Sequence, residues 1–163
     1  MTEYASVSKI LFLCTGNYYR SRFAELLFNQ RAREALLSWT AYSRGLALER
    51  GSKNVGPISV LALKGLAARG IWIPEEVRFP LPVCEQDLCM ADLVIALKET
   101  EHRPLLVQRF PSWPDRIEYW HIDDLDVAAS ETALAATDQE VIKLLARLSR
   151  ANASPAVGQS GTR

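Results

Sequence analysis

The sequence predicts an α/β fold, in which a parallel sheet carries helices on both of its faces within a single domain. Two observations lead to this fold class. Short apolar runs alternate with longer segments of helical spacing, which is the order that builds a parallel sheet. The chain has 163 residues, enough for one domain of ordinary size with a complete hydrophobic core.

The first half of the chain reads as strand, helix, strand, loop and helix. Phe23, Leu26 and Leu27 recur at helical spacing after the first apolar run. Pro57 suits a first helical position, where its missing N–H is not needed, and Gly70 is the expected stop. The expected elements are a strand at 9–13, a helix at 22–37, a strand at 38–43, a loop at 51–56 and a helix at 57–69.

The second half begins with a proline-rich stretch and ends with an amphipathic helix. Thr137-Asp138-Gln139-Glu140 is a capping-box pattern that predicts the start of this helix, and its apolar stripe continues to Leu148. After Arg150 the chain turns to Ser, Ala, Gly and Pro. We therefore assign residues 1–150 to the domain and expect a disordered tail at 151–163. The other expected elements are irregular chain at 71–83, one helical turn at 85–90, and strands at 92–97 and 116–121.

The residue types that carry chemistry gather between Cys14 and Ser21, directly after the apolar run at 10–13. A Cys and an Arg with five residues between them, where a strand meets a helix, suit the capture of a phosphate dianion. Backbone N–H groups of such a loop point inward, and the following helix directs its positive end to the same spot. The remaining members of this phosphate-binding loop would be Thr15, Gly16, Asn17, Tyr18, Tyr19 and Ser21.

Each of these residue types has a chemical reason. Arg20 supplies a planar fork of donors for two phosphate oxygens. The positive field of the loop favours the thiolate form of Cys14, which makes the sulfur a nucleophile aimed at phosphorus. Ser21 can donate a hydrogen bond to that sulfur, and Gly16 permits a turn that a side chain would obstruct.

A plainer interpretation exists for the same residues. A cysteine at the end of a buried strand commonly acts as a small apolar residue, and a Cys and an Arg six positions apart also occur by chance. Here the spacing coincides with a strand, a Gly-Asn turn, a Ser after the Arg and an immediate helix. This context favours the functional interpretation.

Leu13-Cys14-Thr15-Gly16-Asn17, Arg20-Ser21 and Ala24-Glu25 resemble the signature of the low-molecular-weight protein tyrosine phosphatase superfamily. That superfamily also contains thioredoxin-coupled arsenate reductases and protein-arginine phosphatases. The resemblance extends unevenly from about Lys9 to about Leu148 through three weaker segments. These are Ser43-Arg44-Gly45, Ala91-Asp92-Leu93-Val94-Ile95-Ala96-Leu97 and Phe110-Pro111.

The resemblance implies a four-stranded parallel sheet in the order 2-1-3-4 and a cysteinyl-phosphate mechanism with Cys14 as nucleophile. It also implies a general acid after the fourth strand, with Asp124 the better match and Asp123 the second. An Asp pair after a strand is by itself usually a solvated turn or a helix cap. Because the carboxyl ends of parallel strands meet at one edge, these aspartates, Cys14 and Ser43 are expected on the same rim. In the family, the serine matching Ser43 bonds the side chain that matches Asn17.

The sequence departs from the family pattern at four positions, namely Tyr18, Tyr19, Arg22 and Leu125. Tyr18 stands where the family tunes substrate choice, with threonine in arginine phosphatases and a larger apolar residue in tyrosine phosphatases. Tyr19 replaces a common second cysteine. Arg22 and Leu125 each replace a proline. The reaction is therefore better defined than its substrate.

Two other functions remain open. Arsenate reduction needs two further cysteines in a relay after the third strand, but Cys84 and Cys89 precede that strand, and Lys98-Glu99 follows it. A non-catalytic module that binds phosphate or a phosphoprotein would have no need of a thiolate nucleophile and an acid. Phosphomonoester hydrolysis, by a protein tyrosine phosphatase, is the preferred interpretation.

Composition excludes several other classes. Nineteen Lys and Arg balance nineteen Asp and Glu, which indicates neither a nucleic-acid nor a membrane partner. Three cysteines without a disulfide-scaffold spacing suit a reducing cytoplasm. The Cys and His residues lack a metal-ligand spacing, and neither His102 nor His121 is assigned a role. We expect no metal and no cofactor, and a phosphorylated protein or small aryl phosphate as substrate. The oligomeric state is left open.

Overall fold

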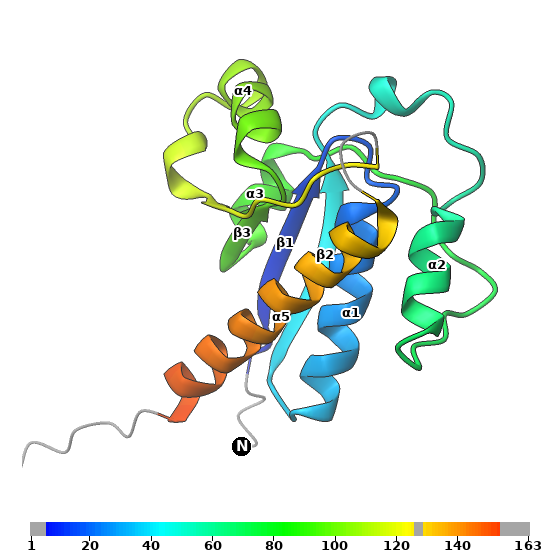
Figure 1. The fold of residues 1–163 in the computed structure, drawn as a ribbon. Helices are drawn as coiled ribbons and strands as arrows, with labels where there is room; N and C mark the ends of the chain where they lie inside the picture. The colour runs from blue at the N-terminus through cyan, green and yellow to red at the C-terminus, as the bar shows by residue number, and fades with distance from the viewer. Residues whose placement is uncertain (1–5, 126–128, 154–163) are drawn as a thin grey trace, which may run out of the picture.

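The structure is a computed structural model that describes residues 6–125 and 129–153. Its centre is a sheet of parallel strands in the order β2-β1-β3-β4, which confirms the predicted fold class and strand order (Figure 1). Since every strand runs the same way, the carboxyl ends meet at one edge of the sheet. The strands are β1 (Ser8–Cys14), β2 (Trp39–Gly45), β3 (Leu93–Ala96) and β4 (Glu118–Tyr119).

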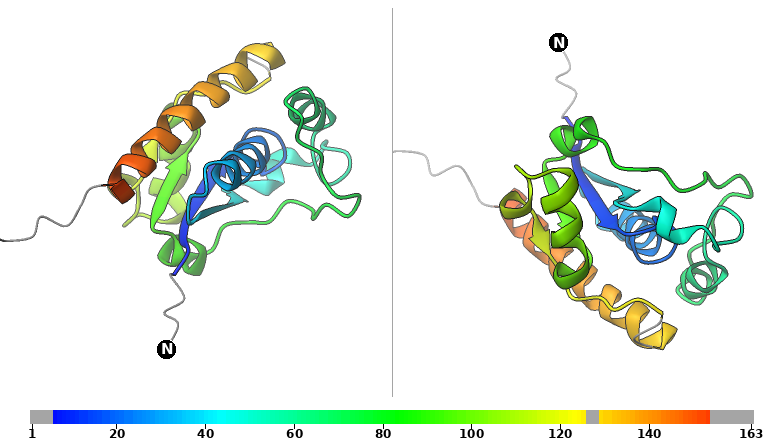
Figure 2. Two further views of the ribbon diagram at one scale, coloured as in Figure 1. Left: turned by 90° about the horizontal axis from the view of Figure 1, so that it is seen from below. Right: turned by 90° about the horizontal axis from the view of Figure 1, so that it is seen from above.

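Helices cover both faces of this sheet (Figure 2). The alternation along β1 divides the core, because Ile10 and Phe12 face one layer and Leu11 and Leu13 the other. The first layer holds α1 (Arg20–Glu34), α2 (Val60–Ala67) and α5 (Ser130–Ala153). The second holds α3 (Glu85–Met90) and α4 (Glu99–Arg109), and two short 3₁₀ turns lie at η1 (Leu48–Gly51) and η2 (Pro114–Arg116).

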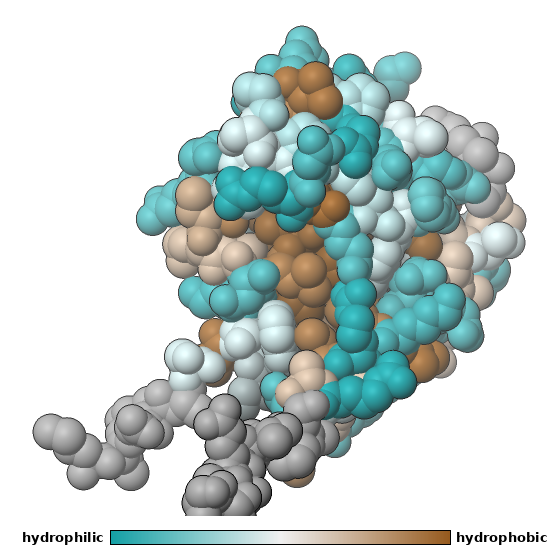
Figure 3. All heavy atoms as spheres, turned by 90° about the vertical axis from the view of Figure 1, so that its left-hand side faces the viewer, coloured by the Kyte–Doolittle hydropathy of each residue, from teal (hydrophilic) through white to brown (hydrophobic). Residues whose placement is uncertain are grey.

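The open edge of the sheet at β4 is short and charged. Figure 3 looks onto this side of the molecule and shows apolar residues in the middle of the face with hydrophilic residues around them. Arg147 of α5 binds the Glu118 carboxylate of β4 at 2.7 and 3.0 Å. A two-residue edge strand that carries an ion pair offers little backbone to another chain.

Two predicted helix starts were wrong, one by two residues and one by three. α1 begins at Arg20 rather than at Arg22, since the loop after β1 enters the helix directly. α2 begins at Val60 rather than near Pro57, because the Ser59 hydroxyl accepts a hydrogen bond from the N–H of Leu61 and caps the helix. Local capping therefore overrides the position that favours proline.

The last helix departs most from expectation. α5 begins at Ser130, so the capping-box prediction at Thr137 was wrong. The Thr137 hydroxyl donates to the Ala133 carbonyl at 2.9 Å, a bond made inside a helix rather than at its start. The helix continues through Ala153, although residues 151–153 were assigned to the tail. The rest of the predicted tail lies outside the described residues.

Candidate active site

The thiol of Cys14 lies buried at the carboxyl end of β1, and Arg20 opens α1, so the loop between them joins strand and helix as predicted. The sulfur accepts a hydrogen bond from the N–H of Asn17 at 3.2 Å and lies 2.9 Å from the Ser21 hydroxyl oxygen. That oxygen already accepts a bond from the Asn17 side chain, which leaves its hydrogen free to point at sulfur. Both donors stabilise a negative charge on the sulfur.

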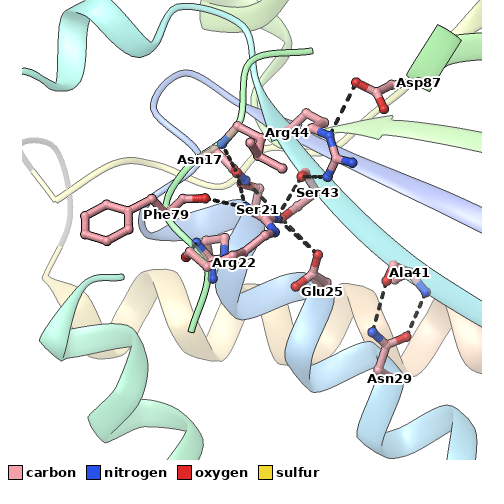
Figure 4. A network of polar contacts seen from close by, with 12 residues as sticks. Asn17, Ser21, Arg22, Glu25, Asn29, Ala41, Ser43, Arg44, Phe79 and Asp87 are labelled. Atoms are coloured by element: carbon pink, nitrogen blue, oxygen red, sulfur yellow. Dashed lines mark hydrogen bonds and ion pairs between the residues drawn. The ribbon is translucent and has the colours of Figure 1, made fainter. Parts of the chain in front are cut away.

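Asn17 holds the loop in an unusual backbone conformation. Its φ of 51° lies in the left-handed region that few residues other than glycine adopt. The amide nitrogen donates to the hydroxyls of Ser21 and Ser43, both at 2.9 Å, and the resemblance implied the second of these bonds (Figure 4). The amide oxygen accepts from the Arg78 side chain at 3.0 Å and from the N–H of Leu81 at 3.1 Å. These four bonds offset the strain of the left-handed turn.

The expected role of Gly16 was wrong. The φ of Gly16 is not positive. A Cβ built on Gly16 would contact only the Asn54 side chain, at an ordinary van der Waals distance of 3.5 Å. The glycine that the loop needs is Gly45 at the end of β2. A Cβ on Gly45 would lie 2.9 Å from the Thr15 carbonyl oxygen and 3.1 Å from the Asn17 side chain. The loop therefore rests directly on the β2 backbone.

Arg78 is a functional candidate that the sequence analysis missed. It comes from the irregular segment before α3, and its guanidinium donates to both the carbonyl and the hydroxyl of Ser43, at 2.9 and 3.2 Å. Burial lowers the pKa of Arg78, although the Glu25 carboxylate at 3.5 Å acts in the opposite direction. Proline-rich, aperiodic sequence gave no signal for this contact.

Arg22, one of the departures from the family pattern, is also buried behind the loop. Its guanidinium donates to the carbonyls of Pro57 and Arg78, each at 3.1 Å, while its Nε has no partner among the described residues. Burial, and after it the charge of Arg78, lowers the pKa of Arg22 to about 10. Arg22 thus ties two irregular segments to the start of α1, a role that a proline there could not perform.

The two aspartates separate clearly. Asp124 lines the pocket that contains the thiol, and its carboxylate lies 3.7 Å from the Arg20 guanidinium. Asp123 instead forms an ion pair with Lys98. The pocket has a volume of about 260 Å³. Its lining residues are Cys14, Thr15, Gly16, Tyr18, Tyr19, Arg20, Arg50, Gly51, Asn54, Asp124 and Leu125.

A carboxylate from α4 also reaches this loop, and the sequence analysis did not anticipate it. Glu101 binds the Arg20 guanidinium through both of its oxygens, at 2.7 and 2.9 Å. The Thr15 hydroxyl donates to the same carboxylate at 2.6 Å. His102, which had no assigned role, is completely buried, with its Nε2 3.2 Å from the Thr15 hydroxyl. These groups meet because the carboxyl ends of β1 and β3 are adjacent.

The two unusual tyrosines have different surroundings. The Tyr18 hydroxyl donates to the Val55 carbonyl at 2.7 Å, which fixes its ring beside the pocket. Tyr19 is buried, and its hydroxyl lies 2.9 Å from the Ser130 hydroxyl at the start of α5. Burial raises the pKa of Tyr19. Tyr19 thus connects the loop to α5.

The described residues offer less support for a cysteine relay or a metal site. Cys84 and Cys89 are exposed free thiols, unlike the buried Cys14. Within residues 6–125 and 129–153, no cluster of three or more His, Cys, Asp or Glu side chains could hold a metal ion. The helices of that part of the chain also include none that is long and apolar enough to cross a membrane.

Comparison with known proteins identifies the family to which this chain belongs. The family model described as low molecular weight phosphotyrosine protein phosphatase matches residues 9–153. A protein-arginine-phosphatase of Bacillus subtilis (strain 168) is 29% identical over 109 residues, which cover 66% of this chain and 67% of that protein. The low molecular weight protein tyrosine phosphatase of T. tengcongensis is 27% identical, with a TM-score of 0.70 over 86% of this chain and 99% of that one.

YfkJ of Bacillus subtilis shares the fold with a TM-score of 0.75 at 23% identity, over 90% of this chain and 98% of that one. The family match covers most of the chain and includes the loop that joins β1 to α1. The order of the strands and the position of Cys14 after the first of them fit the fold of these relatives. The chain belongs to the low molecular weight phosphotyrosine protein phosphatase family.

Proposed function

We propose that the protein hydrolyses phosphomonoesters through a cysteinyl-phosphate intermediate. The observation that carries this proposal is the convergence on one pocket of a buried thiol with two donors, a guanidinium and a carboxyl group. In the first step the Cys14 sulfur attacks phosphorus in line, so that an S–P bond forms as the ester P–O bond breaks. Loop N–H groups and Arg20 stabilise the charge on the equatorial oxygens.

Asp124 is the general acid in this proposal. Its carboxyl group gives a proton to the leaving oxygen, and the resulting carboxylate then takes a proton from the attacking water. The water oxygen bonds to phosphorus, the S–P bond breaks, and inorganic phosphate and the thiolate are released. Asp124 suits this role because it lines the pocket, whereas the ion pair with Lys98 occupies Asp123.

We propose phosphotyrosine in proteins as the preferred substrate. The fixed ring of Tyr18 on the pocket wall offers an aromatic surface on which an aryl phosphate can stack. Phosphoarginine is the second candidate, since one relative is named a protein-arginine-phosphatase. Tyr18→Thr should decide between them, because removal of the ring takes away the stacking surface but not the phosphate site.

The test is hydrolysis of p-nitrophenyl phosphate by the wild type and by Cys14→Ser, Asp124→Asn and Asp123→Asn. We expect no turnover from Cys14→Ser and a loss in kcat of about 100-fold or more from Asp124→Asn. Asp123→Asn is the matched control and should keep most of the activity. A wild-type protein that binds vanadate without turnover would refute hydrolysis and revive the binding-module or arsenate-reductase alternatives.

The substrate is tested separately with matched phosphotyrosine and phosphoarginine peptides. We expect the ratio of kcat/KM values to favour phosphotyrosine in the wild type and to move about fivefold or more toward phosphoarginine in Tyr18→Thr, as loss of an aromatic stacking contact of about 1 kcal/mol or more implies. A ratio that already favours phosphoarginine would overturn the substrate assignment without affecting the mechanism.

A further inference from the structure

We infer that Glu101 is a positioning residue for phosphoryl transfer: it fixes the rotation of the Arg20 guanidinium so that one edge of donors faces the phosphate. This inference rests on the proposed hydrolysis, because it assigns a role at the same site. Glu101 lies in the first turn of α4 and is absent from the residues that line the pocket. It therefore acts through Arg20 rather than on the substrate.

The hydrogen bonds of Arg20 leave one edge of the guanidinium unused. A guanidinium has five N–H groups. Glu101 accepts one from Nη1 and one from Nη2, and the Ile122 carbonyl accepts the other from Nη1 at 3.1 Å. Within the described part of the chain, no group accepts from Nε. What remains is the Nε–H and the second Nη2–H, two parallel donors on one edge, which match two oxygens of a phosphate.

The carboxylate that orients Arg20 is itself held from behind. The N–H of Lys98 donates to Nδ1 of His102 at 3.0 Å, so the hydrogen of the neutral ring is on Nε2. Nε2 then donates to the Thr15 hydroxyl, and Thr15 donates to Glu101. The bonds thus run in one direction from the start of α4 through the loop to the carboxylate. Glu101 has little freedom to rotate.

The charge state of the pair suits this role. Burial raises the pKa of Glu101, but the nearby His102 ring and the bonds from Arg20 and Thr15 outweigh it and hold the pKa well below the usual range. Arg20 is buried, with 3% of its side chain exposed. Glu101 therefore remains a carboxylate at neutral pH, and the pair is a charge-assisted, bidentate contact of the kind that fixes orientation.

Without Glu101, a competing partner is close to the same guanidinium. The Asp124 carboxylate lies 3.7 Å from Nη2, and 45% of its side chain is exposed. In Glu101→Gln, Arg20 would lose its charged partner and could turn toward Asp124. That movement would take donors from the phosphate and occupy the carboxyl group that protonates the leaving oxygen. Glu101 thus keeps the Arg20 guanidinium and the Asp124 carboxyl group apart.

The experiment compares Glu101→Gln with Glu99→Gln, which removes the same charge from the same turn of α4. We expect kcat for p-nitrophenyl phosphate to fall about 10- to 100-fold in Glu101→Gln, with a smaller change in KM, since displaced catalytic groups cost about this much. The inhibition constant of vanadate should rise by a similar factor. Glu99→Gln should stay within about twofold of the wild type.

A double-mutant cycle separates positioning from general structure. In the background Arg20→Lys, which keeps the charge but lacks the fork, Glu101→Gln should change kcat/KM by less than about twofold. An equal loss in both backgrounds would overturn the inference, as would a loss below threefold in the wild-type background. If Glu101→Gln does not fold, Thr15→Val replaces it, since loss of the hydroxyl alone should lower kcat and weaken vanadate binding.

The inference can fail independently of the proposed function. If the wild type lacks turnover, calorimetric titration of the full chain with vanadate still measures the loop. Weaker vanadate binding by tenfold in Glu101→Gln, with Glu99→Gln unchanged, would support the orientation of Arg20 even though hydrolysis is refuted. Equal vanadate affinity in both variants and the wild type would overturn it.

Discussion

The loop between β1 and α1 is held from two sides by different chemistry. On one side, the β2-side brace consists of Asn17, Ser43 and Arg78, and its bonds join the Asn17 amide to the Ser43 hydroxyl and to the Arg78 side chain, which also binds the Ser43 carbonyl. On the other, the α4-side brace consists of Glu101, Thr15 and His102, and its bonds end on a single side chain, Arg20. The first brace shapes the loop, whereas the second aims a side chain within it.

This difference predicts different failures. Loss of the β2-side brace should disturb every group that depends on the loop backbone, including the N–H that points at the Cys14 sulfur. Loss of the α4-side brace should leave the Cys14 thiol unchanged and affect only the orientation of Arg20. Loss of the β2-side brace should therefore lower stability and turnover together. Loss of the α4-side brace should lower turnover without an equal loss of stability.

The largest effect is expected for Asn17→Ala. This variant removes four hydrogen bonds and forces alanine into the left-handed backbone conformation of Asn17. Turnover should fall more than about 100-fold, and the free energy of unfolding should fall on the order of 3 kcal/mol. Asn17→Gly should be about 1 kcal/mol more stable than Asn17→Ala, because glycine tolerates a positive φ. Urea unfolding gives both values. Equal stabilities would show that the backbone relaxes instead.

The next effect is expected for Arg78→Met, which leaves the Asn17 amide oxygen and the Ser43 hydroxyl with fewer donors. We expect about 1–3 kcal/mol of lost stability and a roughly tenfold loss in kcat/KM. Arg103→Met is the control, because Arg103 pairs at the surface with an exposed Asp115. A similar loss from both variants would mean that the β2-side brace depends on charge in general rather than on Arg78.

The smallest effect is a pH dependence that only the α4-side brace should show. Burial lowers the pKa of His102, despite the opposing influence of Glu101. The unfolded chain then takes up a proton before the folded one, so stability is intact above about pH 6.5 and falls as pH drops below it, by at most about 1.4 kcal/mol per pH unit. Melting temperatures from pH 7.5 to 5.5 should fall more for the wild type than for His102→Gln.

The exposed His121 provides the comparison for this measurement. His121→Gln should keep the wild-type loss of stability on acidification, since its side chain is solvated in both the folded and the unfolded chain. If His102→Gln and His121→Gln behave alike, the acid sensitivity arises elsewhere. The α4-side brace would then not be the part of the site that responds to pH.

The sequence predicted one brace better than the other for a physical reason. Cys14, Asn17 and Arg20 lie within seven positions of one another, so a local pattern could place them on a strand–loop–helix junction. Glu101 is 81 positions from Arg20, and its contact depends on how β3 directs α4 across the rim of the sheet. An acidic residue in the first turn of a helix is also too common to indicate a role.

The missed parts of the β2-side brace have a different origin. Arg78 lies in a segment with no periodicity and no regular structure, so its side chain could not be assigned a direction. The sequence already favoured Asp124 over Asp123 as the acid, and the ion pair between Lys98 and Asp123 supports that preference. Thr137 misled the prediction because a capping pattern is local, whereas the start of α5 is fixed by the tertiary contact between Ser130 and Tyr19.

That contact also makes sequence spacing part of the site. Tyr19 holds the start of α5 through Ser130, and the N–H of Ile122 binds the Leu97 carbonyl at 2.8 Å. Asp124 therefore lies two residues from a backbone anchor beside the loop. Only Asp123 lies between Ile122 and Asp124, so one residue inserted there would move the carboxyl group along the rim even if every side chain were kept. Length, as well as residue type, therefore determines where the proposed acid lies.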